Sequence, residues 1–267
     1  MSSPSSADKI LAILDLFSET RLEWTPDEMM AELNYSRPTL YRYLKSLRQA
    51  GFLTSLSGGG FSLGPRVVEM DFLLRKSDPL IRLGQPYLEA LVAEFPCSAL
   101  LVRWYGEKLL CVNSKCSVAD PVSSYPRGRP MPLSHGAISR AIMAFLPRRK
   151  LAGLVEAQLC SLLEVGLGRT VEDIIDALRE VRRAGVAVAY GEVTPGVVGV
   201  AAPVFDARTV PLATLSVTIS EQNMTPERLN KIQDRLRTAT TELSEKLGYE
   251  RYEEDLPSYE KKQVRSA

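Results

Sequence analysis

The chain has 267 residues, of which 45% are hydrophobic and 24% charged, and its formal net charge is +1. This composition is that of a globular protein and excludes a fibrous or intrinsically disordered chain, while the length favours two domains of unequal size. A net charge near zero provides no overall attraction to nucleic acid, so a DNA-binding function must depend on local clusters of charge.

Metal sites and membrane segments are not expected. No two cysteines form a Cys-x-x-Cys pair, and His135 is the only histidine. We therefore predict no structural zinc and no other cofactor. The segment Met1–Ser6 is polar, and no stretch approaches the ~18 uninterrupted apolar residues of a transmembrane helix. These features predict a soluble, cytoplasmic protein whose thiols are reduced.

Residues 1–64 predict a winged helix-turn-helix domain. An apolar stripe at helical spacing predicts a first helix over 8–20. Thr25-Pro26-Asp27-Glu28 is typical of a capping box with proline in the first turn, and it predicts the start of a short second helix. After a tight turn, a third helix is expected over 37–50. The run Ser57-Gly58-Gly59-Gly60 separates two short alternating segments and predicts a β-hairpin, the wing.

The third helix has the composition of a DNA-reading helix. Leu40, Leu44 and Leu47 form an apolar stripe, and the opposite face carries basic residues and no acid. Arg donates two hydrogen bonds to a guanine edge, while Lys, Thr and Tyr commonly hold phosphates. The predicted DNA-binding residues are Arg37, Pro38, Thr39, Tyr41, Arg42, Lys45 and Arg48.

Two alternatives stay open at this domain. For the third helix considered alone, the alternative is a basic face that is exposed to solvent and binds nothing. The capped helix before it and the glycine hairpin after it favour DNA binding. The hairpin holds no Lys or Arg, so its phosphate contacts would come from Ser, Thr and backbone N–H groups. A hairpin that only covers the domain core is the other interpretation.

The remaining elements predict an α+β domain behind a linker helix. The linker helix is expected over 65–78, and the domain over 79–248. Thr170 and Asp173 mark the start of one helix, and Gly185 its end. The charged segment 249–267 is predicted to be a mobile tail. The other expected elements are helices near 80–95, 135–146, 170–184 and 225–247, a hairpin over 99–114 turning at Gly106, an irregular segment over 117–132, and strands near 186–190, 198–205 and 211–219.

Three segments, in this order, resemble the IclR family of bacterial transcriptional regulators, and the resemblance spans about Asp8 to Leu247. These segments are 25–33 with 37–53, 128–147, and 182–206 with 215–218. Pro38 departs from the family pattern, which usually has Ser there. The resemblance implies a GAF- or profilin-like α/β effector-binding domain, control of catabolic genes by a small organic acid (an aliphatic or aromatic carboxylate), and a homodimer or homotetramer. It also implies that the linker helix joins subunits.

The resemblance also implies an effector site, whose residues would be His135, Ala137, Ile138, Gly199, Ser216 and Thr218. Ser216 and Thr218 alternate on one strand, so both hydroxyls face the same side. Helix N-terminal N–H groups near 135–137 are further candidate donors. Ser134 displaces His135 by one position from the family pattern, so a pocket role and a structural role both stay open.

Charged groups near this site have alternative roles. Candidate cations for an acidic ligand are Arg103, Arg127 and Arg129, each of which is otherwise a solvated side chain. Glu192 matches a family acid whose role is either structural or in the pocket. Ala189 and Gly199 replace an acid and a cysteine of some family members, so the identity of the effector is not determined by the sequence.

An enzyme and a protein–protein adaptor are the competing functions. The sequence contains no Ser-His-acid arrangement, phosphate loop or metal cluster, and a hydrolase that used Cys116 or Cys160 would lack an evident base. We expect no catalytic residue and no metal, and the expected partners are double-stranded operator DNA, a small organic acid and a second copy of the chain. The operator sequence, repression or activation, and dimer or tetramer are left open.

Overall fold

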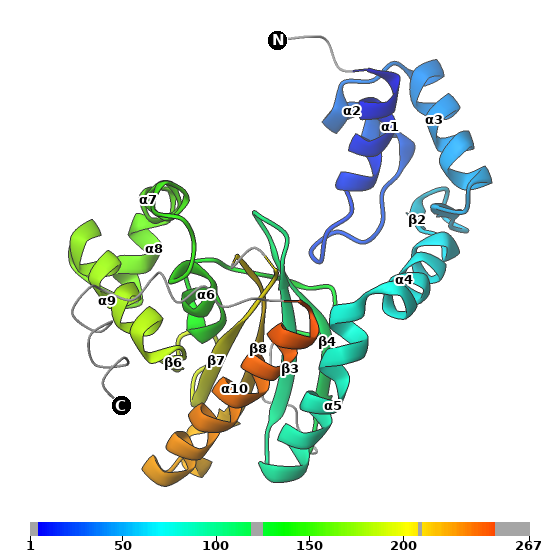
Figure 1. Cartoon of the computed structure of the whole chain (residues 1–267). Helices are drawn as coiled ribbons and strands as arrows, with labels where there is room; N and C mark the ends of the chain where they lie inside the picture. The colour runs from blue at the N-terminus through cyan, green and yellow to red at the C-terminus, as the bar shows by residue number, and fades with distance from the viewer. Residues whose placement is uncertain (1–4, 119–124, 208–209, 249–267) are drawn as a thin grey trace. The chain divides into compact units, whose positions relative to one another are not determined.

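A computed structural model of the chain describes residues 5–118, 125–207 and 210–248 (Figure 1). The predicted tail over 249–267 lies outside the described residues. The chain divides into two compact units, Met1–Asp78 and Pro79–Ala267. Among the described residues, no helix is long and apolar enough to cross a membrane.

The N-terminal unit contains three helices, a hairpin and a fourth helix. Its elements are α1 (Ser6–Asp15), α2 (Pro26–Leu33), α3 (Arg37–Gln49), β1 (Leu53–Ser55), β2 (Phe61–Leu63) and α4 (Pro65–Ser77). Thr25 and Glu28 form the predicted capping box at the start of α2. The prediction that the first helix extends to residue 20 is wrong, because after Asp15 the chain turns back and Ser18 pairs with Arg21 in an antiparallel bridge.

The turn between α2 and α3 positions the third helix on the domain core. Asn34 adopts the left-handed conformation (φ 59°) that ends α2. Helix α3 buries the predicted leucine stripe and also Tyr43. The ring of Tyr43 meets that of Tyr35 edge-on, with 6.2 Å between the centroids. The buried core of this unit consists of Ile13, Trp24, Met29, Leu40, Tyr43, Leu44, Leu47 and Leu53.

Helix α4 differs from the other helices of this unit because none of its residues is buried. Val68, Phe72 and Leu73 are all more than half exposed within the single chain. A helix with this much exposed apolar surface is typical of an interface element.

The C-terminal unit is built around a six-stranded antiparallel sheet. Its strands are β3 (Ser98–Trp104), β4 (Leu109–Cys116), β5 (Pro130–Met131), β6 (Ala187–Tyr190), β7 (Val197–Phe205) and β8 (Pro211–Ser220), in the spatial order β5-β4-β3-β8-β7-β6. Its helices are α5 (Pro79–Glu94), α6 (Gly136–Met143), α7 (Arg148–Ala157), α8 (Leu159–Glu164), α9 (Val171–Ala184), the 3-10 helix η1 (Glu221–Asn223) and α10 (Pro226–Lys246).

Helices cover both faces of this sheet. Helices α5 and α10 pack on one face, where Leu88 and Ile232 join a core that includes Leu101 and Leu215 (Figure 1). Helices α6 to α9 pack on the other face, against the neighbouring strand residues such as Leu100. Successive strand residues point to opposite faces, so Ser216 lies on the α6 side of the sheet.

Three predictions for this unit need correction. Helices α7 and α8 were not expected, because Gly153 and the break at Gln158 interrupt the apolar period. Strand β5 lies within the segment 117–132 that was expected to be irregular. The helix expected over 135–146 ends at Met143.

Candidate functional site

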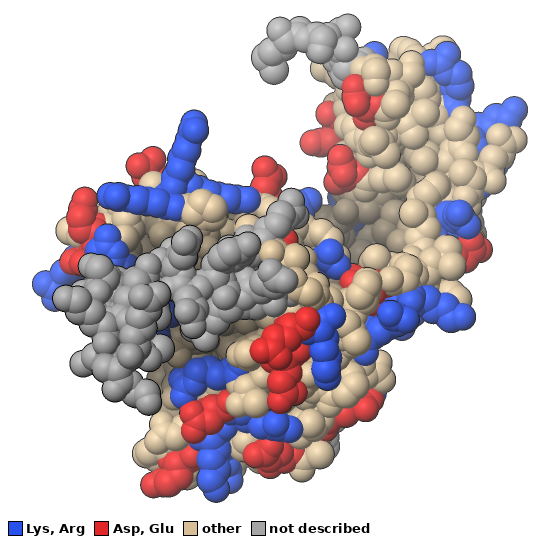
Figure 2. All heavy atoms as spheres, viewed as in Figure 1, with Lys and Arg blue, Asp and Glu red and all other residues tan. Residues whose placement is uncertain are grey.

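The face of α3 opposite its buried stripe is open to solvent. Of the predicted DNA-binding residues, Thr39 is half-buried and all the others are exposed; the exposed ones are Arg37, Pro38, Tyr41, Arg42, Lys45 and Arg48. In the N-terminal unit, Lys and Arg side chains project on the side where α3 lies, whereas Asp and Glu gather on the side of α1 and α2 (Figure 2). Helix α3 itself carries four basic residues and no acidic residue.

The first turn of α3 has donors that its own cap does not use. The hydroxyl of Ser36 donates to that of Thr39 at 2.9 Å and makes no capping bond to a backbone N–H. Pro38 supplies no N–H group, which limits the number of such donors. Uncapped N–H groups at a helix N-terminus are suited to a phosphate.

Aromatic rings hold two of the arginines on α3. The guanidinium of Arg37 lies 5.6 Å from the ring centroid of Tyr41, and that of Arg42 lies 5.2 Å from Tyr43. Hydrogen bonds from Ser6 and Arg42 lower the pKa of the Tyr43 phenol. The guanidinium of Arg42 is therefore held against a ring that is anchored in the domain core.

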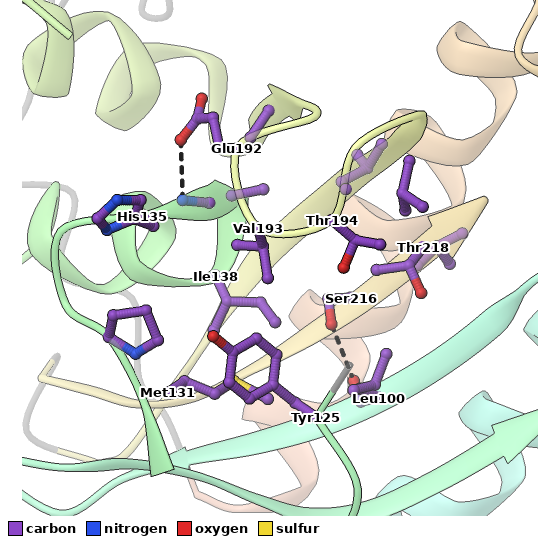
Figure 3. Close-up of a pocket in the computed structure, with 18 residues that line it drawn as sticks. Leu100, Tyr125, Met131, His135, Ile138, Glu192, Val193, Thr194, Ser216 and Thr218 are labelled. Carbon is purple, nitrogen blue, oxygen red and sulfur yellow. Dashed lines mark hydrogen bonds between the residues drawn. The ribbon is translucent and has the colours of Figure 1, made fainter. Parts of the chain in front are cut away.

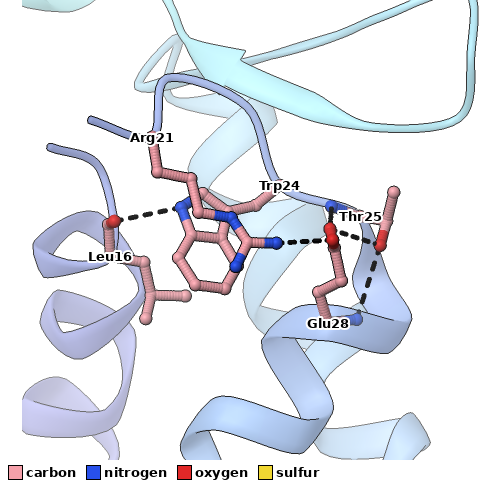
Figure 4. Close-up of polar contacts among 5 residues, drawn as sticks. All are labelled: Leu16, Arg21, Trp24, Thr25 and Glu28. Atoms are coloured by element: carbon pink, nitrogen blue, oxygen red, sulfur yellow. Dashed lines mark hydrogen bonds and ion pairs between the residues drawn. The ribbon is translucent and has the colours of Figure 1, made fainter. Parts of the chain in front are cut away.

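A polar cluster fixes the start of α2, the helix before α3 (Figure 4). The guanidinium of Arg21 stacks 3.4 Å from the ring centroid of Trp24 and pairs with Glu28 at 2.5 Å. The indole Nε1 of Trp24 donates to the carbonyl oxygen of Leu16 at 3.0 Å. These contacts connect the end of α1 to the cap of α2.

The C-terminal unit contains a cavity of about 60 Å³ between α6, the strands β7 and β8, and the turn that joins β6 to β7 (Figure 3). A single buried water needs only about 10–15 Å³, so this space is suited to a small molecule. All the predicted effector residues line it, namely His135, Ala137, Ile138, Gly199, Ser216 and Thr218.

Small side chains create the space. A Cβ atom on Gly199 would lie 3.8 Å from that of Ala137, so the strand and the helix approach each other there. Ala189 also lines the cavity and belongs to a cluster of buried alanines. The positions where some family members carry an acid and a cysteine are therefore both in the cavity wall.

Two strand hydroxyls form the polar part of the sheet wall. Ser216 donates to the carbonyl oxygen of Leu100 at 3.5 Å, and Thr218 donates to that of Ser98 at 3.4 Å. Both bonds are at the long limit for a hydroxyl donor and are weak. Each hydroxyl also keeps its acceptor lone pairs, so both groups are suited to rotate toward a ligand.

The N-terminus of α6 is already engaged by an acid from the chain itself. The amide of Gly136 donates to Glu192 Oε2 at 2.9 Å, and Arg140 pairs with Glu192 Oε1 at 2.6 Å. One of the predicted backbone donors near 135–137 is therefore engaged by Glu192 in this structure. The structure places Glu192 both in the cavity wall and in a structural ion pair, so its two proposed roles coexist.

The candidate cations do not line the cavity. Among the described lining residues, Glu192 is the only Asp, Glu, Lys or Arg. Arg129 stacks 5.2 Å from the ring centroid of Tyr125, which is in the wall, and Arg103 stacks on Tyr105. His135 Nδ1 lies 2.6 Å from the Ser134 hydroxyl, and its ring is on the opposite side of the cavity from Thr218 (Figure 3).

Sequence reasoning missed several lining residues. Tyr125 and Met131 come from the segment expected to be irregular, and periodicity gives no signal there. Val193 and Thr194 come from the turn between β6 and β7. A Thr-Pro-Gly run such as 194–196 is typical of a turn, but it does not report the direction in which the side chains of the turn point.

Both parts of the chain match the same protein family. Residues 6–57 match the IclR helix-turn-helix domain, and residues 74–245 match the bacterial transcriptional regulator IclR C-terminal domain. The chain is 27% identical over 245 residues to the HTH-type transcriptional regulator KipR of Bacillus subtilis, covering 90% of this chain and 96% of that protein. It is 25% identical over 229 residues to the Pca regulon regulatory protein of Pseudomonas putida, covering 83% and 76%.

Solved structures have the same fold. The IclR transcriptional regulator from Alicyclobacillus acidocaldarius matches with a TM-score of 0.75 at 21% identity, covering 92% of this chain and all of that chain. An IclR homologue from Microbacterium hydrocarbonoxydans, solved in complex with 4-hydroxybenzoate, matches with a TM-score of 0.71 at 19% identity, covering 91% and 99%. The chain belongs to the IclR family of bacterial transcriptional regulators, with a winged helix-turn-helix domain followed by an effector-binding domain.

Proposed function

We propose that this regulator binds a palindromic operator through α3 of paired subunits, and that a small organic acid in the cavity of the C-terminal unit controls that binding. The observation that carries the proposal is the cavity, in which apolar groups from α6 and β7 surround the hydroxyls of Ser216 and Thr218. An apolar space with a few convergent polar groups is typical of a small-ligand site.

The DNA half of the proposal assigns the exposed face of α3 to the major groove. Arg42 is the base-reading candidate, because its side chain is exposed and its guanidinium packs against the anchored ring of Tyr43. Lys45, one turn further on, is the phosphate-binding candidate. Because the rest of the N-terminal unit is not basic, affinity depends on two copies of α3 in successive grooves. The exposed apolar residues of α4 are the candidate contact between subunits.

Operator titrations with single variants test this half. Arg42→Ala should weaken binding to the specific operator by about 10- to 100-fold, since a bidentate base contact contributes about 1–3 kcal/mol. Lys45→Ala should weaken specific and non-specific binding alike and lower the salt slope by about one. Arg148→Ala, an exposed arginine at the start of α7, is the control and should have no effect. Unchanged affinity in both α3 variants would favour a winged-helix adaptor instead.

The ligand half assigns a small carboxylate, aliphatic or aromatic, to the cavity. The apolar wall suits the body of such an acid, and the strand hydroxyls suit its polar groups. The binding of 4-hydroxybenzoate by the Microbacterium homologue gives additional support. We also propose that the genes under control encode enzymes that degrade the acid.

A thermal-shift screen tests the ligand half. The panel should contain short acids such as pyruvate and aromatic acids such as 4-hydroxybenzoate, each with and without operator DNA. An acid that binds and is present at a free concentration of about 100 times its Kd should stabilise the protein by about 2.7 kcal/mol. It should also change the affinity of the protein for its operator. If no acid changes either the melting temperature or the operator affinity, the proposal of an acid effector is wrong.

A further inference from the structure

The turn between β6 and β7 forms one wall of the cavity. This turn, residues 191–196, contributes Glu192, Val193 and Thr194 to the lining. Glycines with positive φ stand at both of its ends, Gly191 (64°) and Gly196 (72°). Its middle is at the surface, with Val193 39% exposed. The turn is therefore a short cover that separates the cavity from solvent.

Glu192 supplies an ionic contact that holds this cover on α6. Both Glu192 oxygens are engaged, one by the Gly136 amide at 2.9 Å and the other by Arg140 Nη2 at 2.6 Å (Figure 3 draws the first). Both side chains of the ion pair are only 12% exposed. Val193 packs beside this contact, since a Cβ atom on Gly136 would lie 3.0 Å from Val193 Cγ2.

Arg140 is fixed in place but has a donor left over. Its Nη1 donates to the carbonyl oxygen of Val188 at 3.2 Å. Its Nε is buried and has no hydrogen-bond partner among the described residues. A guanidinium binds a carboxylate best in a two-pronged geometry, which the single contact with Glu192 does not provide.

The donors that hold Glu192 are the ones a bound acid needs. They are a helix N-terminal amide and a buried guanidinium, and the residue they hold is part of the cavity wall. We propose that Glu192 is an internal carboxylate that occupies the acid site of the cavity, and that an effector carboxylate displaces it and releases the turn 191–196. This inference rests on the proposed function, because it assumes an acid effector.

The exchange is physically feasible because it conserves charge. Removing one partner of a buried ion pair leaves an uncompensated charge, whereas replacing one carboxylate by another keeps Arg140 paired. The displaced Glu192 belongs to a surface turn, so its carboxylate regains water as it leaves. The effector is then expected to change the conformation of the turn as well as to fill the cavity.

Chemical rescue by acetate tests the displacement, without operator DNA and without the natural effector. In Glu192→Ala, loss of the ion-pair partner should lower the Tm by roughly 5–15 °C. Sodium acetate at about 100 mM should restore a clear part of that loss and should raise the Tm of the wild type much less, because its site is already occupied. Sodium chloride and acetamide at matched concentration should not replace acetate.

Two further variants locate the effect. Combining Glu192→Ala with Arg140→Met should abolish the acetate effect, because the cation is gone. Glu94→Ala, which removes the acid from an exposed ion pair with Arg235, is the matched control and should show no rescue. If Glu192→Ala does not fold, Glu192→Gln replaces it: this variant keeps an acceptor for Gly136 and loses the charge, so acetate should stabilise it more than the wild type.

The outcomes separate this inference from the proposed function. Equal acetate effects in the Glu192 variant, the wild type and Glu94→Ala would overturn the inference, as would no effect in any of them. Rescue by acetate combined with an acid panel that never changes operator binding would support the internal carboxylate and refute acid sensing. If acetate gives no rescue but an acid of the panel changes operator binding, acid sensing stands and the effector carboxylate binds elsewhere in the cavity.

Discussion

Gly64 lies directly against the carbonyl group of Gly51: a Cβ atom on Gly64 would be 2.2 Å from the Gly51 oxygen. That oxygen also accepts a hydrogen bond from the Arg66 amide at 3.0 Å. Since Gly51 follows the end of α3 and Gly64 precedes α4, this close contact connects α3 to α4.

Gly64→Ala should therefore destabilise the N-terminal unit. The Cβ would meet backbone atoms, which have little freedom to move, and overpacking of this kind costs about 1–3 kcal/mol. We expect a lower melting temperature for this unit and weaker operator binding. Gly58→Ala in the wing turn is the control, because a Cβ there meets nothing within 4 Å. Equal stability of the two variants would contradict the close contact.

The cap of α2 predicts a loss of stability in acid. Hydrogen bonds from the backbone and side chain of Thr25 hold the pKa of Glu28 below its usual value of 4.5. A carboxyl group whose pKa is lowered by folding stabilises the folded state above its unfolded pKa, and this contribution is lost as the pH falls through the folded pKa. The stabilisation is therefore complete above pH 4.5 and declines below it.

Glu28→Gln isolates that contribution. The wild type should melt at a higher temperature than the variant near neutral pH, and the difference should shrink as the pH falls well below 4.5. The measurement is a series of thermal melts from about pH 7 to about pH 3. A difference that stays constant with pH would show that the charge of Glu28 does not contribute to stability.

The strand hydroxyls of the cavity should affect ligand binding more than folding. Their existing bonds to the strand β3 are long, 3.5 Å for Ser216 and 3.4 Å for Thr218, so their loss costs little stability. The double variant Ser216→Ala/Thr218→Val should weaken the binding of an acid found in the screen by about tenfold, measured by calorimetry.

Thr214→Val is the matched control on the same strand. Its hydroxyl is buried, has no hydrogen-bond partner among the described residues and does not line the cavity. Removing an unsatisfied buried hydroxyl should raise stability by about 1 kcal/mol and leave ligand affinity unchanged. Equal ligand affinity in the double variant and this control would remove Ser216 and Thr218 from the site.

Cysteine reactivity should follow burial. Burial raises the pKa of the Cys97 thiol to about 12 and that of Cys111 to about 11, whereas Cys116 and Cys160 are exposed. Because the thiolate is the reactive form, iodoacetamide at neutral pH should label Cys116 and Cys160 and leave the other two unmodified. Mass spectrometry would check this, with urea-unfolded protein as the fully labelled control. Fast labelling of Cys97 in native protein would contradict its burial.

Local chemistry made much of the secondary structure predictable. Capping boxes at Thr25 and Thr170 start α2 and α9, and Gly185 ends α9 in the left-handed conformation. These signals act within a few residues, so a sequence displays them directly. The apolar period used for the first helix instead extended too far, because the chain leaves the helix after Asp15 and Ser18 pairs with Arg21 in a bridge.

Long-range pairing explains what the sequence did not reveal. The family resemblance identified the residues that the structure brings together around the cavity, but not the order of the strands behind them. The sequence left the role of Glu192 open, because its partner Gly136 is 56 positions away. The direction of the turn 191–196 depends on that same distant contact, so no local pattern reports it.

The central pairing of the sheet has a consequence for the order in which the protein matures during translation. Strand β3 pairs with β8, and the contact between Leu100 and Ser216 spans 116 positions. The N-terminal unit closes its core within its first 78 residues. Since domains fold as units while the chain emerges from the ribosome, the nascent chain should be able to present α3 before its effector cavity exists. We therefore expect α3 to be exposed on a folded N-terminal unit before the strands that line the cavity have paired.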